Sequence, residues 1–265
     1  MGVSKFAATA VGIGLSVFAI AASAATPEEI RERGKILVAI DVGHAPYGML
    51  DSNARQTGSD VETAQLLAKD LGVALEVVPV SGANRVPYLM TGKVDVVIAS
   101  FSITEERQKV IDFSRPYGVI PVVVSAPATM DIASPADLAG KEIAVARGTT
   151  ADIEVTKLLK TENVKANIIR YEDEATSISA ISTGQQDLLA AALSTANEVA
   201  EQNPNKKLEV KVEMAAYPMA VGLRKSDAEL TDWVNEWVTE NLRNGELNGI
   251  YKKYFHHDLP ESLLE

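Results

Sequence analysis

The sequence contains no cysteine among its 265 residues, and aromatic residues make up only 5% of it. Without cysteine the chain can neither form disulfide bonds nor carry a lipid on an amino-terminal cysteine, so it must rely on a packed core. Basic residues are also scarce, because 25 Lys and Arg oppose 36 Asp and Glu and give a net charge of −11 at pH 7. This balance disfavours nucleic acids and anionic membrane surfaces as partners. It does not disfavour a small anionic ligand, because one nearby arginine outweighs a distant net charge.

Motifs for cofactors and metals are lacking as well. The chain has no glycine-rich phosphate loop, no Cys/His metal cluster and no HExxH pattern. His256 and His257 are adjacent, but a metal site needs several converging ligands and this pair is isolated in the sequence. We therefore expect a protein that needs no cofactor and binds no metal.

The amino-terminal segment has the organisation of a secretory signal peptide. A basic start at Lys5 precedes an apolar, small-residue stretch over residues 6–22, and Ala22, Ser23 and Ala24 form a cleavage triplet. We expect residues 1–24 to be removed. A membrane anchor is the alternative, but the segment is rich in Ala and Gly rather than Leu and Ile. An exported chain without a lipid diffuses freely and is best retained in a Gram-negative periplasm.

The remaining chain alternates between strand-like and helix-like segments, which indicates an α/β architecture. A helix is expected from Ser59, where Ser59 and Glu62 have capping-box spacing, to Gly72. A second, short helix should end at Met90. Strands are predicted at residues 36–40, 74–80, 94–99, 119–127, 142–148, 167–171, 187–194 and 208–214, with further helices from residue 150 and near 176–183.

The carboxyl-terminal region is predicted to be a long amphipathic helix. Ser226 and Glu229 repeat the capping-box spacing. One face is continuously apolar and consists of Leu230, Trp233, Val234, Trp237, Val238 and Leu242. We interpret both tryptophans as core residues rather than ligand platforms. No flexible linker separates the two strand–helix series, so strands near residues 117–122 and 214–219 should cross directly between two units and form a hinge over a cleft.

The segment SFSITEERQKVIDFSRPYG, residues 100–118, follows the apolar run VDVVIA, which is typical of a buried parallel strand. Ligand groups in open α/β sheets gather at the carboxyl ends of strands, where Ser100 and Ser102 fall. Arg107 follows, and its planar guanidinium can donate two parallel hydrogen bonds to a carboxylate. We predict that these three residues form half of an anion site, with Arg107 facing a solvated cleft.

In this order the motifs resemble the periplasmic solute-binding proteins of polar amino-acid ABC transporters. The resemblance rests on GKILVAID, GSDVETAQLLAKDLG, NRVPYLMTGKVDVVIASFSITEERQKVIDFSRPYG, LAGKEIAVARGTTAD and GELNGIYKKYF. It implies a bilobed periplasmic-binding-protein fold, with two α/β lobes joined by a two-strand hinge. Lobe 1 would comprise residues 25–118 and 219–265, and lobe 2 residues 119–218 including the hinge strands. It also implies a monomeric, non-enzymatic receptor that delivers an amino-acid-like carboxylate to an ABC permease.

The resemblance assigns roles to single residues. Ser100, Ser102 and Arg107 would present a backbone carbonyl, a hydroxyl and a guanidinium to the ligand's head group, and Thr150 would donate a backbone N–H from the other lobe. A helix start suits a carboxylate, because its free N–H groups and its dipole favour negative charge. An anion shared by Arg107 and Thr150 would favour the closed form.

Other pocket positions are less certain in role. Relatives place an acid after the first strand, here Asp41, and an aromatic residue three positions later, where this chain has His44. Asp41 could equally cap a turn, and a loop histidine is more often a surface residue. Tyr47 either supplies the aromatic wall or packs behind the loop.

One departure concerns the ammonium group of an amino-acid ligand. Relatives usually carry an acid just after the strand that corresponds to DLLAAALS, but this chain has Ala192 there and no carboxylate over residues 188–193. Ser194 offers only a neutral hydrogen bond, and burying an unpaired charge is costly. Either the ligand is not an ordinary α-amino acid, or its nitrogen is held elsewhere, for example by Asp41 or Glu174.

An enzymatic function is the alternative. Cyclohexadienyl dehydratases share the implied fold, and one acid in the cleft suffices to protonate a leaving hydroxyl. Glu172, Asp173 and Glu174 are the candidates, although acids are also typical of a helix start, which is the role we favour for them. A soluble partner of a membrane sensor is a further alternative.

Overall fold

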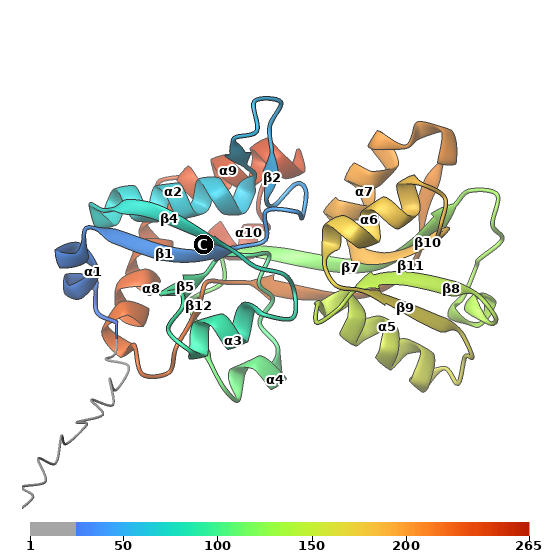
Figure 1. Cartoon of the computed structure of the whole chain (residues 1–265), viewed down its shortest axis with the longest axis horizontal. Coiled ribbons are helices and arrows are strands. Elements are labelled where there is room, and N and C mark those ends of the chain that lie inside the picture. The colour runs from blue at the N-terminus through green and yellow to red at the C-terminus, as the bar shows by residue number, and fades with distance from the viewer. Residues whose placement is uncertain (1–24, 265) are drawn as a thin grey trace, which may run out of the picture.

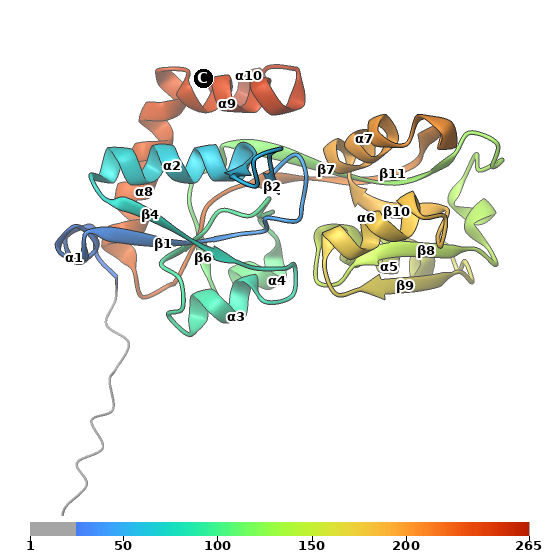
Figure 2. The same ribbon diagram turned by 45° about the horizontal axis from the view of Figure 1, so that its top comes forward.

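The computed structural model describes residues 25–264, so the predicted signal peptide lies outside the described residues. The described chain forms two lobes, each with a five-stranded sheet and helices packed on it, and two long strands run between them (Figures 1 and 2). The predicted bilobed α/β architecture is confirmed.

The sheet of the first lobe has the strand order β4-β1-β5-β12-β6. Its centre is parallel, because β1 (Lys35–Ile40) pairs with β4 (Ala74–Pro79) and with β5 (Val96–Val97). The predicted strand at residues 94–99 is buried throughout, although regular pairing is limited to β5. The other elements of this lobe are α1 (Pro27–Arg33), β2 (Met49–Leu50), β3 (Gln56–Thr57), α2 (Ser59–Leu71), α3 (Arg85–Met90), α4 (Glu105–Gln108), β6 (Asp112–Phe113), β12 (Gly222–Leu223), α8 (Ala228–Arg243), α9 (Glu246–Phe255) and α10 (Glu261–Leu264).

The sheet of the second lobe has the order β11-β7-β10-β8-β9. The pairs β10–β8 and β8–β9 are parallel, whereas β7 pairs antiparallel with both β10 and β11. A helix follows the carboxyl end of each of β8, β9 and β10. The elements are β7 (Gly118–Pro127), a 3-10 turn at Pro135–Leu138, β8 (Glu142–Ala146), α5 (Thr150–Thr161), β9 (Asn167–Tyr171), α6 (Glu174–Ser182), β10 (Leu188–Ala192), α7 (Leu193–Gln202), a 3-10 turn at Pro204–Lys206 and β11 (Leu208–Met219).

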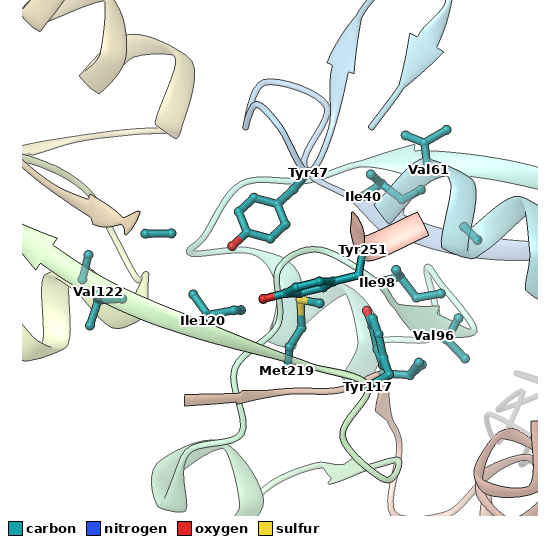
Figure 3. Close-up of a cluster of buried hydrophobic side chains, with 14 of the residues drawn as sticks. Ile40, Tyr47, Val61, Val96, Ile98, Tyr117, Ile120, Val122, Met219 and Tyr251 are labelled. Carbon is teal, nitrogen blue, oxygen red and sulfur yellow. The ribbon is translucent and has the colours of Figure 1, made fainter. Parts of the chain in front are cut away.

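The connection between the lobes is a two-stranded ribbon made of β7 and β11. Their pairing runs from Gly118 opposite Met219 at one end to Leu208 opposite Pro127 at the other. Ser102 forms a bridge to Met219, so the predicted anion segment lies against the first-lobe end of the ribbon. In Figure 3, Tyr117, Met219 and Tyr251 pack at this end, and Ile120 and Val122 continue the apolar cluster toward the second lobe. Motion of one lobe against the other would bend this ribbon.

Both predicted capping boxes are wrong. The residue that caps α2 is Gly58, with φ 125°, and no side chain accepts a hydrogen bond from the first turn. Instead, the backbone N–H groups of Ser59 and Asp60 donate to the carbonyls of Pro46 and Tyr47. The free N–H groups at the start of α2 are thus paired with carbonyl groups of an earlier loop. This loop lies outside the four-residue window of a capping box, so the spacing could not reveal it.

The start of α8 differs in the same way. Asp227 is the capping residue, and its side chain makes no hydrogen bond to the first turn. It forms an ion pair with Arg224 at 2.7 Å and accepts a hydrogen bond from Ser226 Oγ. The apolar stripe of α8 is confirmed, since Trp237 is buried and donates to Asp70 Oδ2 at 2.8 Å, while Trp233 is half-buried.

Candidate functional site

The loop after β5 brings the two predicted serines to the boundary between the lobes. Ser100 has a left-handed backbone, with φ 43°, and its N–H donates to Asp60 Oδ2 at 2.7 Å. Ser102 is fully buried, and its hydroxyl lies 3.2 Å from the hydroxyl of Thr150 in the other lobe. The carboxylate of Asp60 therefore holds the loop in a conformation that few non-glycine residues adopt.

Arg107 lies on α4, where the hydroxyl of Thr104 caps the helix. Its Nη1 donates to the carbonyl of Ser102 at 2.8 Å, and its Nη2 donates to the carbonyl of Gly148 in the second lobe at 3.2 Å. The guanidinium also lies 4.7 Å from the ring centre of Phe101. The expectation that Arg107 faces a solvated cleft is wrong, because the residue is only 8% exposed. Burial, with a further contribution from Arg85, lowers the pKa of Arg107 to about 9, so it stays charged at neutral pH.

The opposing half of the site is the start of α5. Thr149 caps this helix through its hydroxyl, which accepts a hydrogen bond from the N–H of Asp152. Thr150 is the first helical residue, and the first N–H groups of a helix have no partner within the helix. Thr150 and Ala151 line a cavity between the lobes. A negatively charged group in that cavity would meet free N–H groups and the positive end of the helix dipole.

A second group of polar residues lines the same cavity from both lobes. His44 and Arg85 come from the first lobe and Glu174 from the start of α6 in the second. All three are buried, as is Asp41 at the end of β1. The cavity is lined by His44, Arg85, Ser100, Ile120, Val122, Thr149, Thr150, Ala151, Glu174 and Ala192.

His44 is not a surface residue, although loop histidines more often are. Its Nε2 lies 2.8 Å from the hydroxyl of Thr195 in the second lobe, and its Nδ1 lies 3.1 Å from the hydroxyl of Ser100. The Thr195 hydroxyl donates to the carbonyl of Ala45, so it must accept from His44 Nε2–H. Nδ1 of a neutral imidazole then accepts from Ser100. Burial and the charge of Arg85 lower the pKa of His44 to about 3, which agrees with this neutral form.

Three buried carboxyl groups, those of Asp41, Asp60 and Glu174, all interact with the guanidinium of Arg85. Burial raises the pKa of Asp41 to about 6, of Asp60 to about 7 and of Glu174 to about 8, and Arg85 opposes all three increases. Glu174 Oε1 lies 3.7 Å from His44 Nε2. Because His44 is neutral and the pKa of Glu174 lies above 7, this contact is not an ion pair at neutral pH.

Tyr47 and Ser194 lie outside the cavity. Ser194 Oγ donates to the phenol oxygen of Tyr47 at 2.9 Å, which joins the lobes beside the site. The ring of Tyr47 packs against His44 and Phe255, so Tyr47 lies behind the loop rather than forming a wall of the cavity. Asp41 accepts a hydrogen bond from the N–H of Gly43, and it therefore also has the turn-capping role considered above.

The acids at residues 172–174 separate into different environments. Asp173 caps α6 by accepting a hydrogen bond from the N–H of Thr176, and Glu172 is exposed. Glu174 is the first residue of α6, in agreement with the helix-start role that we favoured, and it also lines the cavity. Arg85 was not among the predicted site residues, because its only signal in the sequence is a single basic residue beside the apolar residues of a short helix. Its Nη1 donates to the carbonyl of Ala99 at 2.7 Å.

The raised carboxyl pKa values predict a pH-dependent stability. Between about pH 4 and pH 8, the folded protein retains protons on Asp41, Asp60 and Glu174 that the unfolded chain has released, so the free energy of unfolding should fall as pH rises. We expect a total loss on the order of a few kcal/mol across this window. Denaturant titrations of ligand-free protein at several pH values would measure it. Glu174→Gln should flatten the slope and Glu172→Gln should not, whereas equal slopes in all three proteins would contradict the assignment.

This two-lobed protein is similar in sequence and in structure to known proteins. Residues 36–257 match the model of the bacterial extracellular solute-binding proteins, family 3. The chain is 29% identical to the L-cystine-binding protein TcyJ of Escherichia coli (strain K12) over 234 residues, which cover 87% of this chain and 86% of that protein. The chain belongs to the bacterial extracellular solute-binding proteins of family 3.

Solved structures agree with this assignment. A solute receptor for L-cysteine of Neisseria gonorrhoeae superposes with a TM-score of 0.80 at 33% identity and covers 87% of this chain and 93% of that one. An ancestral amino acid-binding protein, a precursor of cyclohexadienyl dehydratase, gives 0.79 at 32% identity, with 86% and 99% covered. Among residues 25–264, no helix has the length and apolar character needed to cross a membrane.

Proposed function

We propose that this protein is a periplasmic receptor that binds a small polar carboxylate between its lobes and delivers it to an ABC permease. The observation that carries the proposal is a pair of contacts between the lobes: the hydroxyl of Ser102 meets that of Thr150, and Arg107 donates to the carbonyl of Gly148. Relatives named for binding cystine, histidine and glutamine support the ligand class. Export through a signal peptide at residues 1–24 and action as a monomer belong to the same proposal.

The proposed carboxylate lies between a guanidinium and a helix start. Arg107 has five N–H donors, and the two contacts to carbonyl oxygens leave others for a ligand. The N–H of Thr150 is oriented by its place at the start of α5, and the hydroxyl of Ser102 adds a third donor. Because these donors come from different lobes, the carboxylate binds the closed form better than the open form and shifts the population toward it.

A thermal-shift screen tests the proposal. Purified protein would be mixed with amino acids, hydroxy acids and plain carboxylates, and a binder should raise the melting temperature in proportion to its saturation. Calorimetry with the strongest hit should then give one site per chain. A screen in which no carboxylate raises the melting temperature, while an amine or a sugar does, would contradict the proposal.

A second candidate function is that of a dehydratase acting on a cyclohexadienyl acid, and the environment of Glu174 favours it. Its carboxyl is buried in the cavity, and its pKa of about 8 keeps it protonated at neutral pH, as a general acid requires. Incubation with prephenate or arogenate would decide between the two functions. The receptor proposal expects no aromatic product, whereas turnover that Glu174→Gln abolishes would establish the enzyme.

A further inference from the structure

The strand β7 has a cavity on each of its two faces. Ile120 and Val122 line the cavity described above, whereas Val119 and Pro121 line a second hollow. Successive side chains of a strand point to opposite faces, so the two hollows lie on opposite sides of the ribbon that joins the lobes. The second hollow lies between α9 of the first lobe and α7 of the second, which are on the same side of β7 in Figures 1 and 2. We call it the rear groove.

Both lobes form the rear groove, so its shape depends on how they are placed. The hydrogen bond from Ser194 to Tyr47 joins the lobes at the groove, which both residues line. In the same structure the lobes are in contact across the ligand cavity, where Arg107 donates to the carbonyl of Gly148. The rear groove as described therefore belongs to the closed form of the protein.

The first-lobe wall of the rear groove is aromatic. The ring centre of Phe255 lies 4.5 Å from that of Tyr251 and 5.2 Å from that of Tyr47. Tyr251 is only 7% exposed, and its hydroxyl has no hydrogen-bond partner among residues 25–264. In Figure 3 the hydroxyl groups of Tyr47 and Tyr251 point toward the second lobe. A buried phenol normally finds a partner, so the Tyr251 hydroxyl is available to a molecule in the groove.

The second-lobe wall of the rear groove is acidic. Glu198 and Glu201 line the groove from α7, and their spacing of three residues places them on one face of the helix. Gln202 donates to one carboxylate oxygen of Glu198 at 2.8 Å, and the second oxygen remains for another donor. An anion in the groove would face two carboxylates, whereas a cation would be attracted by both.

The basic residues near the rear groove do not balance these acids. Its described lining contains no Lys or Arg, and its basic side chains are His256 and His257. The lysines of α9, Lys252 and Lys253, are paired with carboxylates that lie outside the groove. Aromatic ring faces and carboxylates both attract a positive charge, so the two walls together suit an organic cation.

We infer that the rear groove is a second ligand site, which binds a small organic cation with an apolar body, such as an arylalkylamine, and that this cation strengthens binding of the carboxylate on the other side of β7. The apolar body packs on Tyr251 and Phe255, and the ammonium group donates to Glu198 and Glu201. Because the groove belongs to the closed form, its occupant favours the form that the carboxylate also favours. The second site does not depend on the proposed receptor function, and only the coupling rests on it.

Calorimetry with 2-phenylethylamine on the ligand-free protein tests the second site. We expect one molecule to bind per chain. The uncharged analogue 2-phenylethanol and the anion 3-phenylpropionate should each bind to the groove at least about 10-fold more weakly, because neither carries the positive charge. Absence of amine binding would overturn the site, and equal affinity for the alcohol would overturn the assignment to a cation.

Substitutions on the two walls locate the bound amine. Replacing Glu198 and Glu201 together with Gln should weaken amine binding at least about 10-fold and leave the carboxylate affinity, measured without amine, within about twofold. The matched double variant Glu162→Gln and Glu172→Gln, two exposed acids of the same lobe outside the groove, should change neither affinity. Tyr251→Phe keeps the ring and should weaken amine binding about threefold or more. Unchanged amine binding in the first double variant would overturn the rear groove as the site.

The coupling is measured with the carboxylate that the thermal-shift screen selects. Saturating 2-phenylethylamine should raise the affinity for the carboxylate at least about threefold, and saturating carboxylate should raise the affinity for the amine by the same factor. An unchanged carboxylate affinity would overturn the coupling. A lowered one would mean that the amine competes for the ligand cavity, which would overturn the second site. If no carboxylate binds, the proposed function and the coupling fail together, whereas the amine titrations still decide on the site.

Discussion

Replacing Arg107 with Ala should lower the affinity for the carboxylate ligand by about 30-fold to several thousand-fold. Removing one partner of a buried, charged hydrogen bond costs about 2–5 kcal/mol, and each 1.4 kcal/mol is about tenfold in affinity. Arg107 contributes twice, because it would bind the ligand and it also contacts the carbonyl of Gly148 across the lobes. Calorimetric titration of wild type and variant measures the loss.

A matched control separates the site from general charge effects. Arg115 belongs to the same segment but is exposed, and it donates to Thr239 on the outside of the first lobe. Arg115→Ala should bind as the wild type does. Arg107→Lys should recover little affinity. The planar guanidinium of arginine can donate to Ser102, to Gly148 and to a carboxylate at the same time, whereas a lysine ammonium group cannot. Unchanged affinity in Arg107→Ala would mean that Arg107 only packs on Phe101.

Replacing Gly82 with Ala should keep the lobes from closing fully. The added methyl group would meet the carbonyl oxygen of Arg147 at 2.6 Å, a distance that real Cβ atoms do not show. Overpacking costs about 1–3 kcal/mol, and here the cost falls on the closed form alone, so affinity should drop about 5- to 150-fold. Small-angle scattering with saturating ligand should show a larger radius of gyration than the wild type has.

The control for this change is a second glycine at which an added Cβ would contact no other atom. Gly249 lies in α9, and an ideal Cβ there meets nothing within 4 Å, so Gly249→Ala should leave closure and affinity unchanged. The melting temperature of ligand-free Gly82→Ala should also match the wild type unless the ligand-free protein is closed. Full affinity in Gly82→Ala would show that the lobes do not meet at this glycine in the bound form.

The half of the site that could be predicted from sequence is the half made by local segments. Ser102 and Arg107 follow one buried strand, so the strand end was enough to predict them as candidate site residues, whereas Thr150 was assigned by the family resemblance. The helices and strands were predictable for the same reason, because β1, β8 and α2 each coincide with a short segment whose apolar residues follow a strand or helix pattern.

The rest depends on partners that are distant in the sequence. His44 is buried, and its hydrogen-bond partner Thr195 lies 151 positions away in the sequence. No neighbour of Arg85 in the sequence reveals that it is buried and interacts with three carboxyl groups. Glu174 and Asp173 are both acids at a helix start, and a shift of one residue decides which of them caps the helix and which enters the cavity.

A crystal structure with the amino acid that gives the strongest thermal shift tests the central claim most directly. We expect one closed molecule in which the ligand carboxylate accepts hydrogen bonds from the Arg107 guanidinium and the Thr150 N–H. A carboxylate bound elsewhere, with Arg107 still donating only to Ser102 and Gly148, would contradict the claim that these two residues form the anion site.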